Sequence, residues 1–374
     1  MSQFYDAIVI GGGVNGGSVA YQLAKRGKKV LVLEKDRIAS KASGAAAGMI
    51  AAQAELQDDD PLFQLARKSR KRFASLAEEL KDLSGVDIEL INKGMYKVAL
   101  TDQEVHEYKQ IIDIQKRAGE HAEWVTGDEV RKQEANVSDD ILGAMYIEHD
   151  GHVSAPQLSQ AFIKSAAVLG VTIQEFVEVQ SILFEGEQVV GVATNEGEYK
   201  AENIIVTAGA WSSSFLRQTE LDLPVYPVKG ECFSVRTHQP LLKSTIFSHG
   251  CYLVPKKGGR IIVGATVKPH TYNQQVSVEG VAGLLEKAKH LLPSIGEAEW
   301  DQTWAGIRPQ TADGLPYLGE HPTYNGLFVA TGHFRNGILL SPITGEIMAD
   351  LIERKEPAID VHPFRLDRLT ATNV

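Results

Sequence analysis

The stretch Asp6-Ala-Ile-Val-Ile-Gly-Gly-Gly-Val-Asn-Gly-Gly17 decides the fold of this 374-residue chain. Its apolar first part predicts a buried strand, which leads directly into Gly11-x-Gly13-x-x-Gly16 and then into apolar residues at helical spacing. A second apolar run, residues 30–33, ends on the acid Glu34, 18 residues after Gly16. Strand, glycine turn, helix, strand and acid together form a complete β-α-β unit of the dinucleotide-binding type.

Each position in this unit has a physical role. Gly11 permits the tight turn, Gly13 lets backbone N–H groups approach a pyrophosphate, and Gly16 allows close packing of helix and strand. Glu34 can accept a hydrogen bond from a ribose hydroxyl, and the helix N-terminus favours phosphate. A plain glycine turn in an α/β sheet is the alternative, but it leaves the acid unexplained.

Composition narrows the class of protein. The net charge is −10, with 43% hydrophobic and 23% charged residues, which is typical of a globular protein and disfavours a nucleic-acid partner. The basic residues within 67–72 precede two acids, Glu78 and Glu79, so we expect them to form a solvated helix face. The length predicts one large domain or two interleaved domains.

Targeting, membrane and metal signals are weak. Two cysteines, Cys232 and Cys251, are too few for a disulfide framework, and no His, Cys or carboxylate spacing suggests a metal. The N-terminal apolar stretch belongs to the nucleotide fold, so we expect no signal peptide. The small apolar run 45–52 is too short to cross a bilayer. We therefore expect a cytoplasmic protein with no metal and no membrane partner.

Strand–glycine–helix patterns occur at both ends of the chain and near residue 203, with mixed strands between them. Helical spacing predicts helices over 61–83, 102–118, 155–169, 278–292 and from about 336 to 352. The prediction is an α/β (mixed α+β) fold. A discontinuous Rossmann-like domain comprises 1–85, 145–222 and 303–374, and a substrate domain built on an antiparallel sheet comprises 86–144 and 223–302.

With these pieces in place, the chain resembles the D-amino-acid oxidase superfamily of FAD-dependent oxidoreductases, and within it the bacterial glycine oxidases of thiamine biosynthesis. The resemblance covers essentially the whole length. It rests on the first glycine motif with Glu34, Ser43-Gly-Ala-Ala-Ala-Gly-Met49, Pro227-Val-Lys-Gly-Glu-Cys232, Cys251-Tyr-Leu-Val-Pro255, Val263-Gly-Ala-Thr266, Trp304-Ala-Gly-Ile-Arg-Pro309 and Gly332-His-Phe-Arg-Asn-Gly-Ile-Leu-Leu340. The last two motifs are the most specific.

The resemblance implies noncovalent FAD, with its adenosine diphosphate half on the first glycine loop and its isoalloxazine near 43–49 and 332–340. A helix that begins near 336 would direct N–H groups at the flavin and stabilise the charge of its reduced form. The predicted FAD-binding residues are Gly11, Gly13, Val14, Asn15, Gly16, Glu34, Lys35, Ser43, Gly44, Ala46, Ala47, Gly48, Met49, Val179, Ala208, Gly209, Trp211, Gly306, His333, Phe334, Arg335, Asn336, Gly337, Ile338 and Leu339. A simple turn before a C-terminal helix is the alternative for 332–337.

An amino-acid oxidase must bind a carboxylate, and the planar fork of an arginine matches both oxygens. Arg308, at the end of a predicted strand, is the first candidate; a surface ion pair is its alternative. By resemblance, Tyr252 donates its hydroxyl to the same carboxylate and Arg335 lines the site. Strand packing is the alternative for Tyr252, and binding of backbone carbonyls is the alternative for Arg335.

The predicted chemistry needs no general base, because a neutral amine can lose its Cα hydride to flavin directly. His333 is therefore expected to be a packed histidine rather than a proton shuttle. The sarcosine-oxidising relatives attach flavin through a cysteine near the segment matching 308–313, and this chain has none there. Cys251 should point to the opposite strand face from Tyr252.

Two departures from the family pattern bear on the substrate. Gly250 stands where relatives carry histidine, and Val267 stands where they carry methionine. If both positions face the substrate, the pocket is roomier than a strict glycine site and admits sarcosine or small D-amino acids.

The leading hypothesis is therefore an oxidase that converts glycine to glyoxylate, ammonia and hydrogen peroxide, with an amino-acid or amine substrate and oxygen as its partners. One alternative is a D-amino-acid dehydrogenase that passes electrons to a membrane quinone. Another alternative is a non-catalytic FAD-binding assembly protein. A nicotinamide dehydrogenase is disfavoured, because it leaves the segments 43–49 and 332–340 unexplained. By resemblance we expect a homotetramer.

Overall fold

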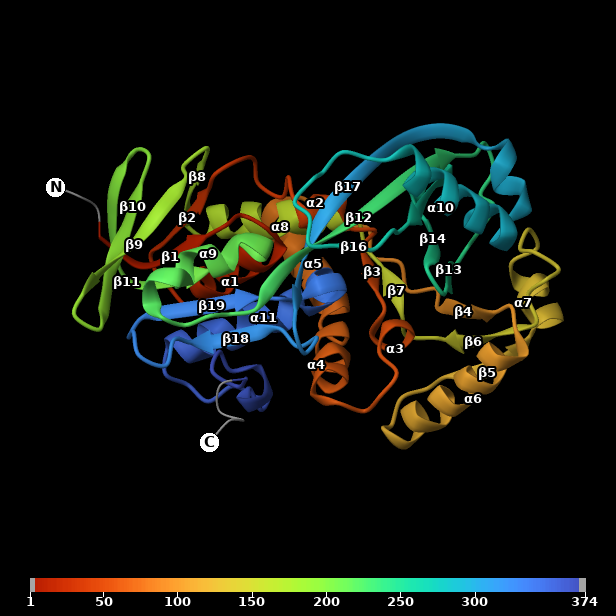
Figure 1. The fold of residues 1–374 in the computed structure, drawn as a ribbon, viewed down its shortest axis with the longest axis horizontal. Coiled ribbons are helices and arrows are strands. Elements are labelled where there is room, and N and C mark those ends of the chain that lie inside the picture. The colour runs from red at the N-terminus through yellow and green to blue at the C-terminus, as the bar shows by residue number, and fades with distance from the viewer. Residues whose placement is uncertain (1–3, 370–374) are drawn as a thin grey trace.

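The computed structural model describes residues 4–369, which build two large β-sheets with helices packed against them (Figure 1). The first sheet lies at the end of the molecule that holds the N-terminus, and the second lies at the opposite end (Figure 1). Parallel and antiparallel strands with intervening helices confirm the predicted mixed α/β class. The domain boundaries stay a prediction.

The first sheet carries the nucleotide-binding unit. Its strand order is β18-β19-β11-β1-β2-β8, with β10 and β9 added as a hairpin on β11. Strands β1, β2, β8, β11 and β19 run parallel, so their carboxyl ends meet at one edge of the sheet. The strands are β1 (Phe4–Ile10), β2 (Val30–Glu34), β8 (Thr172–Glu175), β9 (Val179–Glu185), β10 (Gln188–Thr194), β11 (Gly197–Val206), β18 (Tyr317–Glu320) and β19 (Leu327–Thr331).

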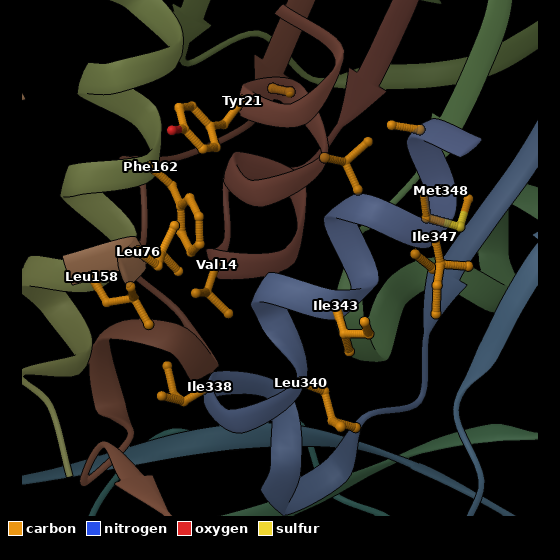
Figure 2. Close-up of a cluster of buried hydrophobic side chains, with 14 of the residues drawn as sticks. Val14, Tyr21, Leu76, Leu158, Phe162, Ile338, Leu340, Ile343, Ile347 and Met348 are labelled. Atoms are coloured by element: carbon orange, nitrogen blue, oxygen red, sulfur yellow. The ribbon is translucent and has the colours of Figure 1, made fainter. Parts of the chain in front are cut away.

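Helices from distant parts of the chain cover this sheet. They are α1 (Val14–Lys25), α4 (Pro61–Arg70), α5 (Phe73–Ser84), α8 (Ala155–Val168) and α11 (Gly337–Ile352). Figure 2 shows side chains of α1, α5, α8 and α11 meeting in one apolar cluster, among them Val14, Tyr21, Leu76, Leu158, Phe162, Ile338 and Ile343. Because α1 and α11 pack together here, the two glycine turns that precede them lie close to each other.

The helix predicted over 61–83 is in fact two helices. Lys71 and Arg72 separate α4 from α5, although both residues keep right-handed helical dihedrals. The apolar period therefore continues across the bend, which is why the sequence does not reveal it. The bend lets α4 pack on α11 and α5 pack on α8.

The second sheet is mostly antiparallel, in the order β16-β12-β15-β14-β13-β4-β6-β5, with β17 on the other side of β12. Only the β13–β4 pair is parallel among these strands. They are β4 (Met95–Ala99), β5 (Glu123–Thr126), β6 (Gly143–Ile147), β12 (Val225–Arg236), β13 (Thr245–Ser248), β14 (Cys251–Pro255), β15 (Arg260–Gly264), β16 (Lys268–Pro269) and β17 (Glu299–Thr311). Helices α6 (Asp102–Arg117), α7 (Gly127–Gln133) and α10 (Val278–Leu291) pack beside it (Figure 1).

Short elements make up the rest of the regular structure. They are α2 (Ala42–Ala45), β3 (Met49–Ile50), α3 (Ala52–Glu55), β7 (Gly151–His152), α9 (Ser212–Leu216) and the 3-10 turns η1 (Gly209–Trp211), η2 (Arg217–Thr219), η3 (Lys257–Gly259), η4 (Pro293–Glu297), η5 (Phe334–Asn336) and η6 (His362–Phe364). Among residues 4–369, no helix combines the length and the apolar character needed to cross a membrane.

The expectation of a solvated basic face over 67–72 is wrong for Arg70. Its side chain is only 6% exposed and lies between Glu120 and Asp150, with 2.6 Å from Nη1 to the Asp150 carboxylate. Asp150 also accepts the backbone N–H groups of Gln53 and Ala54. Arg70 therefore stabilises α3 through the buried Asp150 carboxylate, which binds the N–H groups of α3. The charge pattern of the sequence alone does not distinguish a buried arginine of this kind from an exposed one.

Candidate cofactor and substrate site

A cavity of about 600 Å³ lies where the carboxyl ends of the parallel strands meet the second sheet. Its walls come from the β1–α1 loop, the small-residue segment 41–51, the turn before α11, and strands β12, β14 and β17. Ligands of open α/β sheets bind at this edge.

The β1–α1 loop brings backbone donors to one end of the cavity. Gly11 has a positive φ of 105°, and a Cβ on Gly16 would lie 2.0 Å from the Gly11 carbonyl oxygen, so a side chain fits at neither position. Helix α1 begins directly after Gly13 with no acid in its first turn. Val14 and Asn15, its first two residues, line the cavity, so the positive dipole end of α1 faces it.

Glu34 lies beside this loop at the end of β2. Its carboxylate accepts the Gly12 N–H at 2.8 Å and the Asp36 N–H at 2.9 Å. The side chain still lines the cavity, so a carboxylate oxygen is available to a ribose hydroxyl. Ser43 accepts the Val14 N–H at 2.9 Å and so connects the second loop to the first.

The small residues of 42–49 are small because the backbone is packed closely. A Cβ on Gly48 would lie 2.0 Å from the Val153 carbonyl oxygen, and a Cβ on Gly306 would lie 2.7 Å from Ala45 Cβ. Trp304 of β17 donates its indole N–H to the Ala45 carbonyl at 2.8 Å. The segment is thus a rigid wall against which a flat ring can lie.

The turn before α11 forms the opposite wall. Gly332 has a positive φ of 78°, and α11 begins at Gly337, so its N-terminus points into the cavity. Burial lowers the pKa of His333 to about 3, and its Nε2 lies 3.0 Å from Thr344 Oγ1. His333 is therefore a neutral, packed ring, as expected.

Arg308 projects into the cavity from β17, across the strand β12. A Cβ on Gly230 would lie 2.2 Å from its Nη2, so the missing side chain of Gly230 makes room for the guanidinium. Nη1 donates to the Thr266 carbonyl at 3.2 Å. Within residues 4–369, no carboxylate lies within ion-pair distance of Arg308.

Tyr252 lies beside Arg308 in the same cavity. Its hydroxyl is 3.6 Å from Cys232 Sγ, and a Cβ on Gly264 would lie 2.4 Å from it. Burial raises the pKa of Tyr252 well above its ordinary value, so the phenol stays protonated and can donate. Cys251 belongs to a different apolar cluster from Tyr252, which confirms that the two face opposite sides of β14.

Arg335 also reaches the cavity, but it has an acidic partner. Its Nε and Nη2 donate to the two oxygens of Glu55 at 2.7 and 2.6 Å, and both side chains are mostly buried. Glu55 raises the pKa of Arg335 further above its usual range. The site thus contains one unpaired guanidinium and one neutralised guanidinium.

Comparison with known proteins decides the family. Residues 6–351 match the family described as FAD dependent oxidoreductase. The chain belongs to this family. It is 47% identical over 370 residues to a glycine oxidase of Geobacillus kaustophilus (strain HTA426), covering 98% of each chain. It is 40% identical over 375 residues to a glycine oxidase of Bacillus subtilis (strain 168), covering both fully. A crystal structure of glycine oxidase from Geobacillus kaustophilus matches with a TM-score of 0.96 at 46% identity, over 98% and 99% of the two chains.

The family cofactor is FAD, and this cavity fits it. The glycine cradle, the helix N-terminus and Glu34 suit a pyrophosphate and a ribose. The second helix N-terminus, at Gly337, suits the negative charge of a reduced flavin. Cys232 reaches the substrate end of the cavity, but burial raises the pKa of its thiol, so noncovalent attachment stays our prediction.

Most of the predicted FAD-binding positions line the cavity. They are Gly11, Gly13, Val14, Asn15, Glu34, Lys35, Ser43, Ala46, Ala47, Gly48, Met49, Val179, Ala208, Gly209, Trp211, Gly306, His333, Phe334, Arg335, Asn336, Gly337 and Ile338. Gly16, Gly44 and Leu339 are not among the lining residues. Gly44 packs on the Ala39 carbonyl, and Leu339 lies in the apolar core.

The expectation that Gly250 and Val267 enlarge the substrate pocket required both residues to face the substrate, and this condition is not met. Neither residue lines the cavity. Gly250 lies in an exposed turn next to Lys287, and Val267 is 55% exposed. Gly250 lies between β13 and β14, and Val267 lies between β15 and β16. The direction of a side chain in such a connection is hard to predict from sequence.

The sequence reasoning missed three residues of the substrate end: Glu55, Gly230 and Cys232. Gly230 and Cys232 belong to the motif 227–232, so their residue types were visible although their role was not. Glu55 has no local signal, because its partner Arg335 is 280 positions away in sequence.

Proposed function

We propose that the protein oxidises glycine to glyoxylate, ammonia and hydrogen peroxide. The observation that carries the proposal is the unpaired guanidinium of Arg308, which lies beside the protonated hydroxyl of Tyr252 at the inner end of the cavity. An arginine fork and one phenol match the two oxygens of a small carboxylate. The glycine oxidase names of the relatives support the same substrate.

Each residue then has a defined part. Arg308 binds the substrate carboxylate and Tyr252 donates to one of its oxygens, which orients the Cα–H bond. Bound FAD supplies the chemistry, as acceptor of the Cα hydride and donor of electrons to oxygen. His333 is neutral and packs on Thr344, so it is not assigned the part of a proton shuttle. The imine product hydrolyses in water.

Arg335 has a different part in the proposal. Because Glu55 neutralises it, Arg335 is not a second carboxylate ligand of equal strength. Arg308→Lys should therefore raise KM for glycine more than Arg335→Lys does, since lysine cannot reproduce a two-pronged carboxylate contact.

Sarcosine and small D-amino acids stay in the proposal as further substrates, now without support from Gly250 and Val267. Rates with glycine, sarcosine and D-alanine would rank them. The cytoplasmic location, the homotetramer and a role in thiamine biosynthesis also stay proposals that rest on the resemblance.

The test is an anaerobic absorbance spectrum of the purified holoenzyme before and after glycine, followed by air. Loss of the visible flavin band, with recovery and peroxide formation in air, is the expected result. Bleaching without peroxide would favour a dehydrogenase that uses another acceptor. A flavin that neither glycine nor sarcosine bleaches would overturn the proposed reaction and leave the fold assignment intact.

A further inference from the structure

The motif Pro227-Val-Lys-Gly-Glu-Cys232 carries the family resemblance, yet only half of it enters the site described above. It lies on β12, where successive side chains alternate between faces. Gly230 and Cys232 line the cavity beside Arg308 and Tyr252. Lys229 and Glu231 do not line it, although both are buried, and Glu231 is fully so.

Glu231 binds the beginning of the segment 266–277, which we call the strap. Its backbone N–H donates to Thr266 Oγ1 at 2.9 Å, and Thr266 Oγ1 donates to Glu231 Oε2 at 3.1 Å. Lys268 Nζ lies 3.2 Å from the same carboxylate oxygen. The Glu231 carboxylate therefore contacts both Thr266 and Lys268, in addition to the backbone pairing of this segment with β12.

Glu231 also binds the far end of the strap. Its Oε1 accepts the Ser277 N–H at 2.8 Å and lies 2.9 Å from Lys229 Nζ. Lys229 donates in turn to the Gln275 carbonyl. One buried carboxylate thus holds both ends of a segment whose only regular structure is β16.

The strap contacts the walls of the cavity at two points, one beside Arg308 and one beside a predicted FAD-binding residue, Trp211. The Thr266 carbonyl accepts the Arg308 Nη1 hydrogen bond, the only one that the Arg308 side chain makes within residues 4–369. Farther along, the Tyr272 hydroxyl donates to the Ala210 carbonyl at 2.9 Å. The Tyr272 ring packs on Trp211 with 5.4 Å between centroids, and Ala210 and Trp211 both line the cavity.

Glu231 is charged under any ordinary condition. Burial alone would raise its pKa, but Lys229, the Ser277 N–H and Lys268 together lower it to about 2. An amide in its place would leave Lys229, whose side chain is 6% exposed, without an acidic partner. We therefore expect a substitution of Glu231 to weaken several contacts of the strap at once and not only one hydrogen bond.

We propose that Glu231 is a positioning residue for substrate binding: it fixes the strap, and the strap holds the Arg308 guanidinium in place through the Thr266 carbonyl. This inference rests on the proposed function for the identity of the substrate. Its physical content, the placement of the carboxylate-binding arginine, applies to any small carboxylate in the cavity.

The test compares Glu231→Gln with the parent holoenzyme. We expect KM for glycine and the Kd of acetate, measured by the perturbation of the flavin spectrum, to rise together about tenfold or more. The kcat should stay within about threefold and the FAD content should not change. Amide hydrogen exchange should accelerate over 266–277.

Glu134→Gln is the matched control. Glu134 is equally buried and accepts two backbone N–H groups, from Lys243 and Ser244, but it does not line the cavity. We expect it to lower stability and leave KM and acetate affinity unchanged.

Unchanged KM and acetate Kd in Glu231→Gln would overturn the inference, as would a rise of equal size in Glu134→Gln. Should Glu231→Gln fail to fold, Thr266→Val removes both hydrogen bonds of the Thr266 hydroxyl to Glu231, leaves the Lys229, Lys268 and Ser277 contacts in place, and should give a smaller rise in both constants. No rise would overturn the inference. A parent enzyme that does not oxidise glycine would refute the proposed function, while acetate affinity and exchange would still decide the role of Glu231.

Discussion

The glycine at position 230 makes a quantitative test of the substrate site possible. In Gly230→Ala the new Cβ would lie 2.2 Å from Arg308 Nη2 and 2.3 Å from Cζ, so the guanidinium must move by more than about 1 Å to reach ordinary contact distance. A charge-assisted hydrogen bond contributes about 1.5–3 kcal/mol. Since 1.36 kcal/mol is a factor of ten, loss of one such bond to the substrate carboxylate should raise KM for glycine about 10- to 100-fold.

The same substitution should cost little stability. The clashing atoms are the far end of a flexible side chain that faces a cavity, so we expect the free energy of unfolding to fall by about 1 kcal/mol or less. The assays are steady-state peroxide formation against glycine concentration, acetate titration of the flavin spectrum, and chemical denaturation. These three together separate displacement of Arg308 from general disruption.

Gly283→Ala is the control, because it adds the same methyl group at a helical position with no atom within 4 Å. It should leave KM unchanged. A Gly230→Ala enzyme with KM and acetate Kd within twofold of the parent values would refute the placement of Arg308 as the carboxylate ligand.

Three further predictions follow from buried groups. Gly264→Ala would place a Cβ 2.4 Å from the Tyr252 hydroxyl. We therefore expect KM for glycine to rise severalfold and the free energy of unfolding to fall by about 1–3 kcal/mol. Equal KM values in variant and parent would contradict this prediction. Arg70→Met leaves the buried Asp150 carboxylate without its cation. The free energy of unfolding, measured by urea titration, should therefore fall by about 3–5 kcal/mol, and a loss below about 1 kcal/mol would contradict the prediction. Because burial lowers the pKa of His333 from 6.5 to about 3, the unfolded chain binds a proton that the native ring excludes between these values. The free energy of unfolding therefore falls as the pH falls from 6.5 toward 3, and His333→Gln should lessen the slope of this dependence by about 1.4 kcal/mol per pH unit. Parallel plots of unfolding free energy against pH for variant and parent would count against this prediction.

The first β-α-β unit and its glycine turn could be predicted from the sequence because their determinants are local. Gly11, Gly16 and Glu34 lie within one β-α-β unit, and each residue type is dictated by a contact inside that unit. The break between α4 and α5 escaped prediction, since the helical period continues through Lys71 and Arg72. The burial of Arg70 escaped for another reason: its partners come from other parts of the chain.

The two arginines of the substrate site show where sequence reasoning ends. Arg308 and Arg335 both stand within family motifs, and although the predicted strand end favoured Arg308, the sequence does not show which of the two has an acidic partner. In the part of the chain that the structure describes, the fold makes the distinction by bringing Glu55 to Arg335 and no acid within ion-pair distance of Arg308. An arginine with a bidentate acidic partner has to give up that partner before it binds an anion, whereas Arg308 gives up at most one hydrogen bond to a carbonyl. Under the proposed function, selectivity for a small carboxylate at one place in the cavity therefore depends as much on Glu55, which pairs with the competing Arg335, as on Arg308.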